Sequence, residues 1–168
     1  NGVQYCGPDD FIPVAEETGL IVEMGRWALQ ESCRQLAVWR GQGLSLAYVS
    51  VNVSARQLHD DAFVDMVTGL LQEYQLPPSA LQLEIVERVI AEGPAVERVL
   101  KRLAELGMRL ALDDFGTGYS SLSYLRAFPI HCVKIDRSFI RDVPQNREAA
   151  TLVETIIAMA HSLQKSVV

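Results

Sequence analysis

Short apolar runs alternate with longer amphipathic segments along this chain, and this alternation limits the possible folds more than any other feature. Four apolar runs, rich in aliphatic and β-branched residues, predict strands at residues 46–53, 81–86, 108–113 and 131–135. Apolar residues at helical spacing predict helices at 9–18, 22–41, 60–75, 94–106 and 146–164, and residues 166–168 read as the start of a fifth strand. Helices between strands are typical of parallel sheets, so the chain is predicted to be an α/β protein.

The two faces of the predicted strands favour a (β/α) barrel over a doubly wound sheet. Alternate residues of a strand share a face, and one face of every strand is aliphatic, as Val51, Leu83 and Leu112 illustrate. The other face becomes polar toward the carboxyl end, where Asn52 and Glu84 stand. A doubly wound sheet is covered by helices on both faces and should be apolar on both. A barrel whose mouth holds a polar site should show the observed pattern, so a TIM-type (β/α) barrel is predicted.

The length predicts that this barrel is incomplete. A complete barrel of this type has about 250 residues, whereas this chain has 168. We expect residues 1–168 to be a fragment of a single domain, or a domain whose terminal segments are disordered. Hydrophobic residues make up 49% of the chain and charged residues 21%, which is typical of a globular domain and not of a disordered tail.

Charge and cysteine content narrow the classes of partner. The chain has 15 Lys and Arg against 21 Asp and Glu, a net charge of −6, which argues against DNA or RNA binding because that requires a basic surface. An anionic small molecule is allowed where a metal ion supplies positive charge. No apolar run approaches the length of a membrane span and no signal segment opens the chain, so we expect no direct membrane contact. Three cysteines without CxxC spacing (Cys6, Cys33 and Cys132) indicate free thiols in a reducing, cytoplasmic compartment.

Polar residues stand near the carboxyl ends of the predicted strands: Asn52, Glu84, Asp113 with Asp114, and Lys134. Parallel strands bring these ends to one rim, so three carboxylates and an amide are expected to converge. Carboxylates this close cannot all stay ionised without a cation, and an oxygen-only ligand set favours Mg²⁺ or Mn²⁺. Adjacent aspartates suit a two-metal site for phosphodiester hydrolysis, in which Lys134 holds the attacking water or stabilises charge in the transition state.

Structural roles for the same residues are open alternatives. Asn52 can cap the turn that begins at Ser54, and Lys134 can be an ion-pair partner of Asp113 or Glu84. The aspartate pair can form a solvated turn. Only the joint position of these residues at the strand ends favours the metal site over these alternatives.

Five segments of the chain resemble the EAL domain family of bacterial cyclic di-GMP phosphodiesterases. They are FIPVAEETGLI at 11–21, VNVS at 51–54 with Gln57-Leu58, LEIVE at 83–87, LDDFGTGYSSLSYL at 112–125 and VKIDRSF at 133–139. These segments follow the family's order and spacing along essentially the whole chain. The resemblance implies a modified TIM barrel that hydrolyses one phosphodiester bond of cyclic di-GMP to give linear pGpG.

The resemblance also implies roles for individual residues. Residues that match Asn52, Glu84, Asp113 and Asp114 bind two Mg²⁺ or Mn²⁺ ions in the family. The residue that matches Lys134 helps to position the nucleophilic water. The residue that matches Glu87 holds the DDFGTGYSSL loop, which shapes the second metal site and takes part in dimer contacts. Gln57 and Asp136, which lie in two of the matching segments, are expected to bind substrate.

Two motifs of the family are expected outside this chain. A Glu-Ala-Leu segment should precede Asn1, and Ala-Glu-Gly-Val-Glu should follow Val168; both carry residues that the family uses as metal ligands or as general base. We therefore expect the chain alone to be inactive and the intact parent domain to be competent. Implied partners are a second copy in a homodimer and an upstream GGDEF or sensory domain, which in some members is membrane-anchored. The alternative function is a receptor that binds cyclic di-GMP without cutting it, or a dimerisation module.

Overall fold

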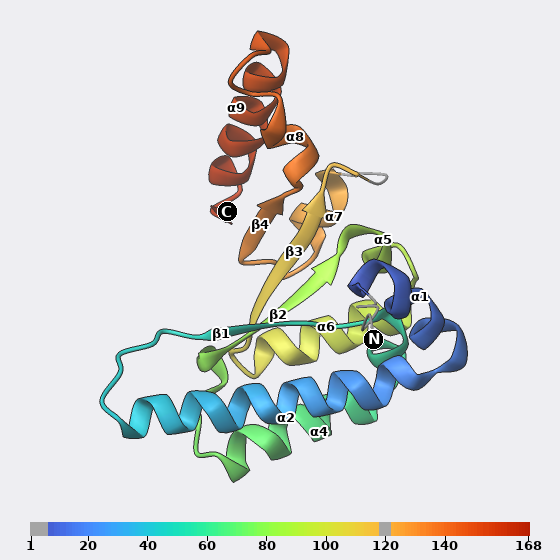
Figure 1. Ribbon diagram of the computed structural model, residues 1–168, viewed down its shortest axis with the longest axis vertical. Helices are drawn as coiled ribbons and strands as arrows, with labels where there is room; N and C mark the ends of the chain where they lie inside the picture. The colour runs from blue at the N-terminus through green and yellow to red at the C-terminus, as the bar shows by residue number, and fades with distance from the viewer. Residues whose placement is uncertain (1–6, 118–121) are drawn as a thin grey trace, which may run out of the picture.

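A computed structural model describes residues 7–117 and 122–168, which form a parallel five-stranded sheet with flanking helices (Figure 1). The strands are β1 (Val49–Asn52), β2 (Leu81–Val86), β3 (Arg109–Phe115), β4 (Cys132–Ile135) and β5 (Ser166–Val167). The longer helices are α1 (Pro8–Thr18), α2 (Leu20–Gly41), α4 (Ala62–Glu73), α6 (Pro94–Glu105), α7 (Leu122–Ala127) and α9 (Arg147–Ser162). Short helical turns are α3 (Ala55–Leu58), η1 (Pro78–Ala80), α5 (Glu87–Ile90) and α8 (Arg137–Arg141).

The strands lie side by side in their order along the chain, from β1 to β5, and each neighbouring pair is parallel. A doubly wound sheet reverses its strand order at a switch point. Consecutive parallel strands linked by helices form the wall of a (β/α) barrel instead. Within the described residues β1 and β5 stay apart as the two edges, so the sheet is an open arc of the predicted barrel.

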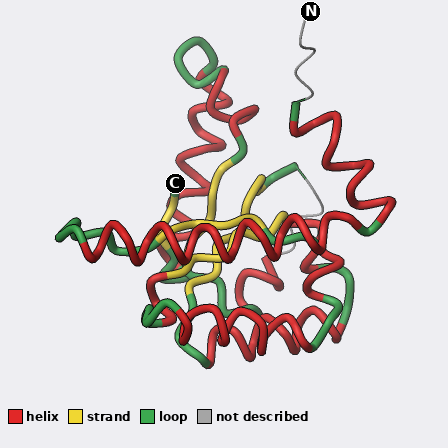
Figure 2. The backbone as a smooth tube through the Cα atoms, turned by 60° about the horizontal axis from the view of Figure 1, so that its bottom comes forward, coloured by secondary structure: helices red, strands yellow, loops and turns green. Residues whose placement is uncertain are grey.

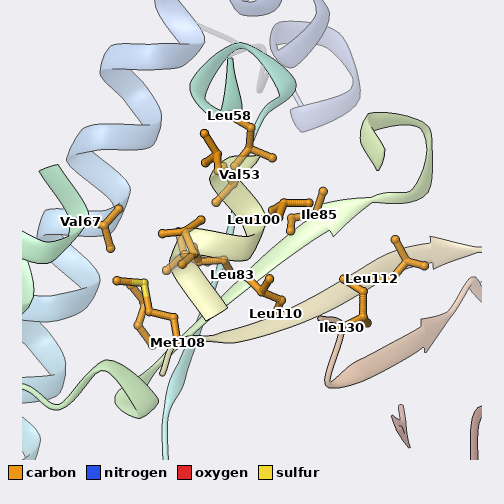
Figure 3. Packing of buried hydrophobic residues seen from close by; sticks show 14 of the residues in the cluster. Val53, Leu58, Val67, Leu83, Ile85, Leu100, Met108, Leu110, Leu112 and Ile130 are labelled. Carbon is orange, nitrogen blue, oxygen red and sulfur yellow. The ribbon is translucent and has the colours of Figure 1, made fainter. Parts of the chain in front are cut away.

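The aliphatic face of the sheet packs against the helices, as the alternation of the strands predicts. The side chains of Leu83, Ile85 and Leu110 are fully buried and gather around Leu100 of α6 (Figure 3). Helix α2 extends this core beside β1 (Figure 2). Burying each such side chain contributes about 1.5–3 kcal/mol. The opposite face of the sheet is left to the polar residues of the strands.

The structure corrects the predicted ends of two strands. The first strand begins at Val49 and not at residue 46, because Val49 already pairs with Leu81, the first residue of β2. Arg40 of α2 donates hydrogen bonds to the carbonyl oxygens of Leu46 and Ala47 at 3.1 and 3.2 Å. These carbonyl groups are therefore held by the helix and not by a strand ladder. The third strand continues to Phe115, two residues beyond its predicted end, and so includes both aspartates.

Helix α3 is fixed by a capping box that buries Gln57. Oε1 of Gln57 accepts hydrogen bonds from the N–H and the hydroxyl of Ser54 at 3.1 and 3.0 Å, and the backbone N–H of Gln57 donates to the Ser54 hydroxyl. The carboxamide of Gln57 also lies against Gly25 of α2, where no side chain intervenes. Gly25 thus lets α2 and α3 approach closely.

Cys33 and Cys132 are buried free thiols, in keeping with the prediction from the sequence, and Cys6 lies outside the described residues. Burial raises the pKa of the Cys33 thiol to about 11. Its unreactive thiol form therefore dominates at neutral pH. In the part of the chain that the structure describes, no helix combines the length and the apolar character needed to cross a membrane.

We predict that Gly25→Ala lowers the free energy of unfolding. A Cβ at this position would clash with both polar atoms of the buried Gln57 carboxamide. Alanine favours a helix over glycine by about 1 kcal/mol, but overpacking costs about 1–3 kcal/mol, and the second effect should win. Gly69→Ala in α4 is the matched control, since a Cβ there has nothing within 4 Å, and it should be stabilising. Urea unfolding followed by circular dichroism measures both; equal effects would contradict the described packing.

Candidate active site

Four adjacent strands bring polar side chains to the carboxyl edge of the sheet. Asn52, the last residue of β1, pairs in register with Glu84 of β2. Asp113 of β3 pairs with Val86 at the end of β2, and Lys134 comes from β4, the next strand along. The rim that the sequence predicts is therefore assembled from neighbouring strands.

Lys134 joins two carboxylates of this rim. Its Nζ lies 2.6 Å from Oε2 of Glu84 and 2.8 Å from Oδ2 of Asp113. The three side chains are sheltered, with exposed fractions of 27% for Lys134, 10% for Glu84 and 18% for Asp113. Burial acts to lower the pKa of Lys134, but its hydrogen bonds to Asp113 and Glu84 outweigh burial, so the pKa is raised. The amine therefore stays protonated at neutral pH and offsets part of the negative charge.

A β-bulge places both aspartates opposite a single lysine. Leu112 pairs with Val133 and Phe115 pairs with Ile135. Between these two pairs β3 has two residues, Asp113 and Asp114, whereas β4 has only Lys134. Asp114 has a φ of 53°, in the left-handed region, and its N–H donates to Oδ1 of Asp113 at 3.0 Å. The sequence analysis placed Asp114 on the loop after the strand, whereas the structure places it inside β3. Consecutive residues of a regular strand point to opposite faces, and the bulge keeps both aspartates near the rim.

Burial is the main influence on the carboxyl group of Asp114. Burial raises its pKa, and the charges of Asp113 and Asp136 raise it further, while Lys134 and Arg88 act in the opposite direction. The net rise means that the ionised form of this carboxyl is disfavoured.

Glu87, the first residue of α5, is expected to hold the DDFGTGYSSL loop, and it contacts the backbone of this loop. Its Oε2 accepts a hydrogen bond from the backbone N–H of Gly116 at 3.0 Å. The Glu87 side chain is buried, and its other oxygen has no hydrogen-bond partner among the described residues. Residues 118–121 of the same loop lie outside the described residues.

Gln57 and Asp136 both make local structural contacts. Gln57 caps α3 and is only 3% exposed, although it lies in the wall of a cleft described next. Oδ1 of Asp136 accepts a hydrogen bond from the N–H of Ser138 at the start of α8, and hydrogen bonding to Ser138 lowers the pKa of Asp136. The backbone N–H of Asp136 donates to the carbonyl oxygen of Phe115 at 3.5 Å, so this residue lies near the end of β3. Substrate binding by either residue stays a prediction.

A cleft of about 590 Å³ adjoins the rim at the end of β1 and has Asn52 in its wall. Two polar pairs line it: Nε2 of His59 lies 2.7 Å from Oε2 of Glu92, and Nη2 of Arg88 lies 3.7 Å from Oε2 of Glu16. The sequence analysis missed these pairs, because their members are far apart in the chain. The short helices α3 and α5, which bring them together, have too few residues to show a helical period.

The rim offers oxygen ligands without a ready-made cluster of three acids. In residues 7–117 and 122–168, no three His, Cys, Asp or Glu side chains lie where they could hold one metal ion together. The predicted two-metal site stays a prediction, because Glu84 and Asp113 both bind Lys134 in the described structure. These two carboxylates and the amide of Asn52 still form an all-oxygen set. Such a set fits Mg²⁺, which completes its shell with water and substrate phosphates.

Comparisons with known proteins point to one family. A family model described as EAL domain matches residues 1–168. Signaling protein YkoW of Bacillus subtilis (strain 168) is 44% identical over 166 residues, 98% of this chain and 21% of YkoW. Cyclic di-GMP phosphodiesterase PdeR of Escherichia coli (strain K12) is 41% identical over 162 residues, 96% of this chain and 24% of PdeR. The chain thus spans about a fifth to a quarter of the length of these relatives.

The arrangement of the elements matches a solved structure. The PaMucR phosphodiesterase in complex with c-di-GMP has a TM-score of 0.91 and 38% sequence identity, covering 99% of this chain and 68% of that chain. The open arc of strands is therefore a part of a larger, TIM-barrel-like domain in that protein.

We predict that Lys134→Met destabilises the protein. Glu84 and Asp113 would keep their sheltered positions without the cation that they share, and breaking such a pair costs about 3–5 kcal/mol. Lys101→Met is the matched control, because Lys101 pairs with Glu97 on an exposed helix face, where such pairs contribute at most about 1 kcal/mol. Urea unfolding at pH 7 measures the difference. Equal losses in the two variants would show that the rim pair has no special role in stability.

Proposed function

The chain belongs to the EAL domain family, and we propose that it forms the catalytic rim of a metal-dependent phosphodiesterase that hydrolyses cyclic di-GMP to linear pGpG. The observation that carries the proposal is the position of Lys134 between Glu84 and Asp113 at the carboxyl edge of the sheet. Two relatives support the choice of substrate, since PdeR is named a cyclic di-GMP phosphodiesterase and PaMucR was solved with c-di-GMP.

We propose that Asn52, Glu84, Asp113 and Asp114 hold two Mg²⁺ or Mn²⁺ ions. The all-oxygen donor set and the position of Asp114 directly after Asp113 in the bulge support this assignment. When bound, the ions supply Lewis acidity at the phosphate and lower the pKa of water.

Lys134 orients the attacking water and stabilises negative charge on the phosphoryl oxygens. Although burial acts in the opposite direction, its hydrogen bonds to Asp113 and Glu84 raise the pKa of Lys134, which favours the protonated form that this charge-stabilising role requires. In the reaction the water oxygen bonds to phosphorus, the bond from phosphorus to the ribose O3′ breaks, and O3′ takes up a proton. The proton that the water loses and the proton that O3′ gains balance in the overall hydrolysis.

The remaining candidate residues have supporting roles in this proposal. Glu87 fixes the backbone of Gly116 and so the end of β3 that carries the aspartates. Asp136, near Asp114, and Gln57, in the wall of the cleft beside Asn52, contact the substrate. In the longer protein we propose a cytoplasmic homodimer under the control of an upstream GGDEF or sensory domain. The relatives' large extent beyond the matched region supports further domains.

We predict that Asp113→Asn lowers kcat for cyclic di-GMP hydrolysis on the order of 100-fold, because an amide binds a divalent cation more weakly than a carboxylate. The measurement is the rate of pGpG formation by the full-length protein with Mn²⁺, followed by chromatography. Asp65→Asn is the matched control, since Asp65 lies on α4 and pairs with Arg102 at the surface. It should turn over like the wild type.

The outcomes separate the proposal from its alternative. Equal turnover by wild type and Asp113→Asn would refute the metal assignment. Cyclic di-GMP binding that survives EDTA, without product in the wild type, would identify a receptor.

A further inference from the structure

Gly116, the residue that follows β3, is held from two sides. Glu87 accepts its N–H at 3.0 Å on one side. On the other side lies the ring of Phe139, which would be 2.7 Å from a Cβ built at position 116. The φ of Gly116 is 101°, which favours glycine. The α-carbon of Gly116 therefore packs directly on the Phe139 ring.

One short segment of chain touches both the carboxylate pair and this glycine. Lys134, in β4, binds Asp113, and Phe139, in the α8 helix that follows β4, packs on Gly116. Backbone hydrogen bonds from Phe139 to Asp136 and from Asp136 to Phe115, at 3.1 and 3.5 Å, connect the start of α8 to the end of β3. Figure 1 shows α8 beside this end of β3.

The bulge makes such packing necessary. The register between β3 and β4 shifts between Leu112 and Phe115, so the regular ladder is interrupted where the two aspartates lie. Their backbone positions then depend on contacts other than the ladder. Gly116 lies immediately after this interruption. Its contacts with Glu87 and Phe139 therefore fix the carboxyl end of the segment that carries the two aspartates.

We propose that Phe139 is a positioning residue for the Asp113–Asp114 segment. Its ring fills the space against Gly116 and holds the segment where Asp113 meets Lys134. Without the ring, Gly116 keeps its hydrogen bond to Glu87 but loses the packing contact on its opposite side. The consequence for metal binding rests on the proposed function; the consequence for the mobility of the segment does not.

The first test compares amide hydrogen exchange in the full-length protein without added metal. Phe139→Ala should speed exchange of the peptide that contains residues 113–117, and Phe139→Tyr, which keeps the ring, should not. Ile140→Ala is the matched control, because Ile140 is the next residue of α8 and is 45% exposed. Exchange in Phe139→Ala that equals the exchange in Ile140→Ala would overturn the proposal.

The second test measures Mn²⁺ affinity by titration calorimetry, together with thermal unfolding. Phe139→Ala should weaken binding about tenfold, as loss of a group that orients metal ligands does, whereas Phe139→Tyr and Ile140→Ala should bind like the wild type. A fall in thermal stability with unchanged affinity would make Phe139 merely structural and overturn the proposal. A wild type that binds no Mn²⁺ would refute the proposed function, while the exchange experiment would still decide the role of Phe139.

A double-mutant cycle tests the contact itself. Gly116→Ala should speed exchange of residues 113–117 in the wild-type background, because its Cβ meets the ring. In the Phe139→Ala background the added effect should be smaller, because only the backbone strain of a positive φ is left. Strictly additive effects would show that the two residues act independently and would overturn the proposal.

Discussion

Two carboxylates from adjacent strands share one ammonium group, and the geometry of the whole rim depends on that sharing. Parallel strands stand about 4.8 Å apart, so acidic side chains at neighbouring carboxyl ends repel one another. Lys134 reduces this repulsion for Glu84 and Asp113 by binding both at hydrogen-bond distance. Three strands are thereby cross-linked on the polar face of the sheet, opposite the aliphatic face that the helices cover. The same contact explains why a cluster of acids is tolerated in a sheltered place.

The bulge lets both aspartates stay at the same rim. A regular β3 would turn Asp114 away from the rim, whereas the extra residue keeps it next to Asp113. Burial raises the pKa of Asp114, and the charges of Asp113 and Asp136 raise it further, so the ionised form of this carboxyl is disfavoured in the protein by itself. A divalent cation bound beside this carboxyl would favour its ionised form.

The sequence predicts which side chains share a face of each strand, but it does not predict the β-bulge in β3. Once a strand is recognised, its period of two fixes which residues face the helices, so Glu84 and Lys134 were placed on the polar face correctly. Asp114 was misplaced because a bulge is a relation between two strands, and the residues of β3 alone do not encode it. The capping pair of Ser54 and Gln57 had a readable signal in its spacing of three residues. The expected substrate contact of Gln57, by contrast, rests on the family resemblance alone.

Three strands of the rim, β1, β2 and β4, are followed almost directly by helices. Helix α3 begins at Ala55, three residues after β1 ends; α5 follows β2 without a gap; and α8 begins two residues after β4 ends. The backbone that follows the polar residue of each of these strands is therefore ordered by the next helix. Ordering backbone on association costs about 1–2 kcal/mol per residue, and little of this cost is left to be met at these three positions. A molecule that contacted these three positions would therefore meet backbone that is already ordered.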